Sequence, residues 1–174
     1  MRRIAVIVAL GAMLGMFAGV LTASPALAGR GHKWQLVPAT PFTIPEGFCG
    51  FKIRVTIPVN KEYSKILKTS NGSMTTLFSG SLKVTLTNLS TGKAITENVS
   101  GPGKGTTHPD GSLTIAAKGH NGPVVLAPAD AKRFGLPTVS VTAGALSESV
   151  TANGAITALS LHGHVLVDVC AALT

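Results

Sequence analysis

The chain has 174 residues, of which 45% are hydrophobic and only 5% aromatic, and 15 lysines and arginines outnumber seven acidic residues for a formal net charge of +8. This charge favours anionic partners. The lysines stand singly, and the only tryptophan and tyrosine are Trp34 and Tyr63. These features argue against a dedicated nucleic-acid site, which interleaves basic and aromatic side chains.

Residues 1–28 have the pattern of a secretory signal peptide. Arg2 and Arg3 precede an uncharged apolar run from residue 4 to 20, and the segment ends in the small-residue motif Ala26-Leu27-Ala28. We expect cleavage after Ala28 and secretion of the remainder. An uncleaved anchor is the alternative, because the uncharged stretch is long enough to span a bilayer. Cleavage would leave 146 residues with a net charge near +6, no membrane span and no lipid-anchor cysteine.

The remainder predicts an extended arm followed by one β domain. Residues 29–47 are interrupted by prolines and form the expected arm, and residues 48–174 form the domain. The clearest strand covers residues 51–57, where Phe51, Ile53, Val55 and Ile57 alternate with Lys52, Arg54 and Thr56. Such alternation is typical of a half-buried strand.

Further strands are expected at intervals of about 8–12 residues along the chain. Asn71-Gly72 predicts a hairpin between residues 63–69 and 74–78, and the turn at 90–92 should pair residues 82–89 with 94–100. Later strands are expected at 113–117, 124–126, 139–143, 146–150, 156–161 and 165–169. Residues 128–134 predict one short connecting helix, since Pro128 suits its first position and Gly135 its end.

Together these elements predict an all-β fold, a single antiparallel meander. We expect a closed or nearly closed barrel, because closure removes exposed strand edges. A two-sheet sandwich is the alternative.

Cys49 and Cys170 are the only cysteines. An even number in an exported chain indicates a disulfide. Their positions bracket nearly all of the patterned sequence, so the bridge should join the two ends of the domain. No C-x-x-C motif supports a redox or metal role for the pair.

Several segments carry a family resemblance: Phe48-Cys49-Gly50-Phe51, Val59-Asn60-Lys61-Glu62, residues 86–93, residues 99–103 and residues 168–173. In these the chain resembles a group of small, functionally uncharacterised secreted proteins of actinobacteria. The resemblance covers almost all of the expected mature chain and implies secretion. It implies no activity, ligand or catalytic residue.

His162, His164 and Asp168 are the candidate metal ligands. On an unbroken strand they share one face, and two imidazoles with a carboxylate suit a three-ligand site. Asp168 lies too far along the strand to join the histidines unless the strand bends, and Gly163 offers a place for a bulge. The alternative is two exposed histidines on a polar strand face.

Glu97 and Glu148 are the candidate acid–base residues. Each shares strand parity with apolar neighbours, so an inward position would desolvate it and raise its pKa. Such a pair would suit acid–base chemistry or a polar ligand. The alternative is a carboxylate near a strand end that reaches water. No nucleophile, phosphate-loop or cofactor motif accompanies them.

The leading functional hypothesis is a secreted, non-enzymatic β-domain that binds an envelope or extracellular ligand, such as an anionic envelope polymer. The first alternative is a small barrel whose interior holds an apolar ligand, or performs isomerase- or cyclase-type chemistry at Glu97 and Glu148. The second alternative is a metal-binding module. Whether the chain is an enzyme is left open, with a binding role favoured and no cofactor expected.

Overall fold

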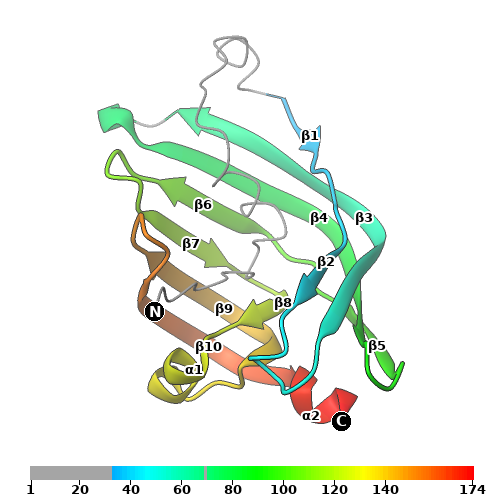
Figure 1. Cartoon of the computed structure of the whole chain (residues 1–174). Coiled ribbons are helices and arrows are strands. Elements are labelled where there is room, and N and C mark those ends of the chain that lie inside the picture. The colour runs from blue at the N-terminus through cyan, green and yellow to red at the C-terminus, as the bar shows by residue number, and fades with distance from the viewer. Residues whose placement is uncertain (1–32, 69) are drawn as a thin grey trace.

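The computed structural model describes residues 33–68 and 70–174. The expected signal peptide and the start of the arm lie outside the described residues. The described part is mostly β-structure, with ten strands in one antiparallel sheet and two short α-helices (Figure 1). The strands are β1 (Gln35–Leu36), β2 (Phe42–Ile44), β3 (Ile53–Lys68), β4 (Met74–Asn88), β5 (Ala94–Asn98), β6 (Gly103–Thr107), β7 (Leu113–Ala117), β8 (His120–Val125), β9 (Val139–Val150) and β10 (Ile156–Asp168). The helices are α1 (Pro128–Phe134) and α2 (Val169–Leu173), and a 3₁₀ turn, η2 (Ser70–Gly72), closes the β3–β4 hairpin.

The sheet is an open meander. Its main path runs β1-β3-β4-β6-β7-β9-β10, while β2 pairs with β3, β5 with β4 and β8 with β9. Within the described residues β10 pairs only with β9, so the two ends of the sheet do not meet. The expectation of a closed barrel is therefore not supported. The sandwich alternative is not met either, because hydrogen bonds join all ten strands in one sheet.

The sheet divides at one end. The central strands β6 and β7 pair with each other, but β5 continues along β4 while β8 continues along β9. The two diverging parts face each other across the main core, which takes residues from β2, β3, β4, β8, β9 and α2. Packing between these parts hides apolar surface that an open sheet would otherwise expose.

The start of β3, which contains most of the strand expected at residues 51–57, has the expected faces. Ile53 and Val55 are 0% exposed, while Lys52 and Arg54 are exposed. This confirms the alternation at the centre of the pattern. Phe51, at its start, is half-buried and packs against the core.

Each of the longest strands in the structure covers two strands that the sequence predicts as separate elements. Residues 51–57 and 63–69 lie largely within β3, while the segments either side of Gly80, Gly144 and Gly163 form β4, β9 and β10. A Cβ atom at any of these three glycines would overlap backbone of the neighbouring strand. Glycine is required there because two backbones approach closely, and the strands continue through it.

The hairpin at η2 is confirmed, because Lys68 pairs with Met74 across it. Helix α1 is confirmed from Pro128 to Phe134, and Gly135 ends it with φ 66°. A second core joins this helix to β8, β9 and β10.

The disulfide between Cys49 and Cys170 is confirmed, with their Cα atoms 5.2 Å apart and their positions separated by 121 in the sequence. It ties the segment before β3 to α2, a helix that the sequence pattern did not predict. Side chains also hold α2 in place, since the Asn88 amide donates to the Leu173 carbonyl at 3.0 Å. Within residues 33–68 and 70–174, no helix is both long and apolar enough to cross a membrane.

Candidate functional site

Glu148 is the most deeply buried carboxyl group in the described chain, at 2% exposure. It lies on β9, directly opposite Ile115 of β7 and Leu159 of β10. Its Oε2 atom has no hydrogen-bond partner in the described residues. Burial raises the pKa of Glu148 to about 7, so the side chain is protonated in a large fraction of molecules at neutral pH. Of the two orientations that the sequence left open for Glu148, the side chain takes the inward one.

Glu62 is a second buried carboxyl group, at 7% exposure, and the sequence did not single it out. A register shift between Thr56 and Val59 reverses the faces of β3, so the glutamate turns inward while Tyr63 is 43% exposed. Burial also raises the pKa of Glu62. A β-bulge of this kind leaves little trace in the alternation pattern, which explains the omission.

Glu97 lies elsewhere. It is half-exposed on β5, opposite Val84 of β4, and β5 pairs with no other described strand. Glu97 and Glu148 are therefore on strands that are not neighbours. The structure does not unite them into a pair of carboxylates.

His162 and His164 are exposed on β10, opposite Ala145 and Ala143. Asp168 instead accepts a hydrogen bond from the Ala171 amide at 3.1 Å and caps α2. The register shift that bends this end of β10 lies between Val165 and Val167 rather than at Gly163. The described residues contain no group of three histidine, cysteine or acidic side chains placed to hold a metal ion.

The cavity between the facing parts of the sheet, within the described residues, is small. A cavity of about 40 Å³ lies between β3, β4 and β8, with Glu62 and Asn121 in its wall. That volume suits water, since ligand sites usually measure roughly 300–1,000 Å³. Glu97 and Glu148 do not line it. This cavity offers no room for the apolar ligand of the barrel hypothesis.

The outer face of the sheet has a larger hollow, of about 440 Å³, over β6, β7, β9 and β10. The register places Lys104, Ala116, Ser147 and Ser160 in one row across these four strands. In the adjacent row the Lys118 amide donates to the Pro102 carbonyl at 3.0 Å, and His162 lies opposite Ala145. Small side chains thus form the floor, and the cationic or imidazole groups of Lys104, Lys118 and His162 border it. We call this region the outer hollow.

No acidic side chain of the described residues lines the outer hollow. β6 and β7 contain no acidic residue, and those of β9 and β10 are the buried Glu148 and the helix cap Asp168. The lysines appear isolated in the sequence, and only the strand register brings Lys104 and Lys118 to one place. Sequence reasoning therefore missed this cluster. From the sequence, these lysines counted only toward the net positive charge.

Comparison of the chain with protein-family models, curated proteins and solved structures finds no match.

Proposed function

We propose that this protein is a secreted, non-enzymatic binding domain that holds an anionic polymer of the cell envelope against the outer hollow. The observation that carries the proposal is the position of Lys104 and Lys118 at the border of one hollow, which has a floor of small side chains and no acidic residue among the described residues of its lining. Ammonium groups attract carboxylate, phosphate or sulfate groups, and the hydroxyls of Ser147 and Ser160 supply hydrogen-bond donors.

Secretion is supported by the signal-peptide pattern, the resemblance to small secreted actinobacterial proteins and the disulfide. Disulfides persist in oxidising compartments and are rare in the cytosol. A hollow that crosses four neighbouring strands suits an extended polymer better than a compact metabolite, because repeated groups of a polymer can contact successive strands.

A binding role is favoured over catalysis by the geometry of the acidic residues. Glu148 is enclosed between apolar neighbours and lines none of the described hollows, while Glu97 lies on a different part of the sheet. An acid–base mechanism requires its groups within hydrogen-bond reach of a bound substrate.

The test is equilibrium binding of heparin and linear polyphosphate, as anionic probes, with neutral dextran for comparison. The association constant for both polyanions should fall steeply as salt is raised, because exposed charges are screened. The double variant Lys104→Ala/Lys118→Ala should lose about tenfold or more in affinity at low salt, roughly 1.4 kcal/mol. Dextran should not bind.

The matched control is Lys52→Ala/Arg54→Ala, which removes the same charge from exposed positions near the start of β3. Its affinity should stay within about twofold of the parent protein. Equal losses of affinity in the two double variants would show that binding depends only on net charge, and this would overturn the proposed site.

A further inference from the structure

The free edge of β10 differs from the opposite edge of the sheet. Edge strands present unpaired backbone groups, and proteins commonly protect them with charges, prolines or covering segments. The β3 edge is covered by β2 at residues 53–55 and by β1 at residues 63–64, and it contains Pro58 and four basic residues. β10 has 13 residues, contains no lysine, arginine or proline, and pairs only with β9 among the described strands.

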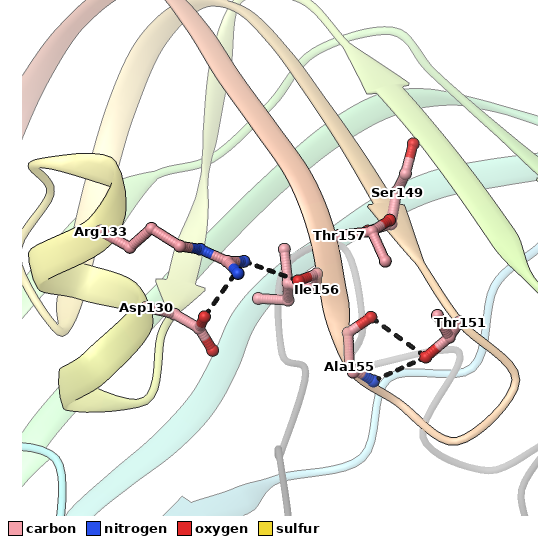
Figure 2. A network of polar contacts seen from close by, with 7 residues as sticks. All are labelled: Asp130, Arg133, Ser149, Thr151, Ala155, Ile156 and Thr157. Carbon is pink, nitrogen blue, oxygen red and sulfur yellow. Dashed lines mark hydrogen bonds and ion pairs between the residues drawn. The ribbon is translucent and has the colours of Figure 1, made fainter.

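Helix α1 stands beside this edge without covering most of it. Figure 2 shows Arg133 reaching from α1 to the Ile156 carbonyl, at 2.6 Å, and held by Asp130 at 3.2 Å. This contact satisfies an acceptor at the first residue of β10. The same hydrogen bond anchors α1 to the start of β10.

Between the helix and the strand lies a hollow of about 300 Å³. Its wall includes Phe134 and Leu136 from the helix side and Leu159 and Leu161 from β10. A groove between an edge strand and a helix is a known arrangement for strand addition, in which backbone pairing supplies affinity and alternate side chains enter the groove.

Charge indicates which kind of strand fits. Lys132 is exposed on α1, Lys118 borders the outer hollow, and the imidazoles of His162 and His164 are exposed on β10. The one acidic residue of α1, Asp130, is already paired with Arg133. A second copy of this basic chain would bring the same lysines together, whereas an acidic strand would complement them.

We infer that the β10 edge binds an extended acidic peptide as an added strand, with apolar side chains at alternate positions in the hollow beside α1. The intervening acidic side chains then lie on the face shared with Ser160 and His162. This inference shares Lys118, Ser160 and His162 with the proposed polymer site and differs from it in requiring backbone pairing at the edge of β10.

The test uses a labelled nine-residue peptide in which glutamate alternates with valine, followed by fluorescence polarisation. Two further peptides carry N-methyl groups on alternate residues, one set on the glutamates and the other on the valines. An added strand pairs along only one of its sides, so one N-methylated peptide should lose about tenfold or more in affinity and the other should keep it. Equal affinity, or equal loss, would overturn the inference.

Side-chain requirements give a second readout. Replacing glutamate by lysine, or valine by serine, in the peptide should each weaken binding by about tenfold or more.

On the protein, Ser160→Glu should weaken peptide binding several-fold by charge repulsion, while the control Ser81→Glu, at an exposed position on β4, should not. The Lys104→Ala/Lys118→Ala variant should preserve the difference between the two N-methylated peptides. Sedimentation that showed a dimer disrupted by Ser160→Glu would instead assign the edge to a second copy and contradict the inference.

Discussion

Two buried carboxyl groups make the stability of this fold depend on pH. Glu148 and Glu62 are both buried, and burial raises the pKa of each. An ionised carboxylate without a partner is unfavourable in an apolar site, so the folded chain binds these protons more tightly than the unfolded chain. Both groups therefore act in the same direction.

The first prediction concerns Glu148 and pH. Its stabilising contribution should be fully present below the unfolded pKa, near 4.3, and lost as pH rises through about 7. The total loss should be of the order of 3 kcal/mol, measured by urea denaturation between pH 4 and pH 8. Glu148→Gln should flatten much of this dependence, and adding Glu62→Gln to that variant should diminish the slope that remains. A stability that rises over the same range would contradict the burial of Glu148.

The second prediction compares neighbouring residues at the start of β3. Ile53→Ala should lower the free energy of unfolding by about 2–5 kcal/mol, because it removes a fully buried side chain from the main core. Lys52→Ala should change it by no more than about 0.5 kcal/mol, since its side chain is exposed. Chemical denaturation measures both, and a larger effect from the lysine would mean that the faces are reversed.

At the level of elements, the sequence predicted the positions of the longer strands, missed β1, β2 and β6, and predicted strand lengths poorly. Alternation and turn residues located the β3–β4 hairpin, α1 and the strand at residues 113–117. Gly80, Gly144 and Gly163 interrupt that alternation like turns, yet the strands continue through them. Whether a glycine ends a strand or permits two backbones to approach depends on contacts between residues distant in sequence.

The third prediction tests this role of glycine inside strands. Gly163→Ala should destabilise the fold by about 2–3 kcal/mol or more, because its Cβ would overlap the Ala143 carbonyl and β9 backbone cannot yield cheaply. Gly47→Ala is the control, since nothing lies within 4 Å of the added Cβ. Thermal denaturation of both variants compares the effects. Equal melting temperatures would show that β9 and β10 do not approach closely at this point.

At the level of the whole molecule, the disulfide joins the two ends of the described domain. It connects the segment before β3 with α2, which packs in the main core beside β4 and β9. The cross-link limits the freedom of the unfolded chain over most of its length.

The fourth prediction is that Cys49→Ser/Cys170→Ser lowers stability by about 2–5 kcal/mol with the strand content of the folded state preserved. Denaturation followed by far-ultraviolet circular dichroism measures both quantities. Identical midpoints for the variant and the oxidised parent would show that the bridge adds nothing to stability.

The candidate site was less predictable than the fold, because it depends on how distant strands pair in the whole sheet. The sequence marked Glu148 by its parity, but Glu62 was hidden by a bulge in β3. Lys104, Lys118 and His162 border one hollow only because β6, β7, β9 and β10 pair side by side. Residues that are aligned across neighbouring strands come from distant parts of the sequence, one from each strand. Their spacing in the sequence therefore does not reveal that they lie together.

The most direct test of the proposed binding role is a polyphosphate titration followed through backbone amide chemical shifts. The account predicts salt-sensitive shifts concentrated at the outer hollow, at Lys104, Ala116, Lys118, Ser147 and His162, with little change around Lys52. Shifts that avoid these residues, or that spread evenly over every exposed lysine, would contradict it.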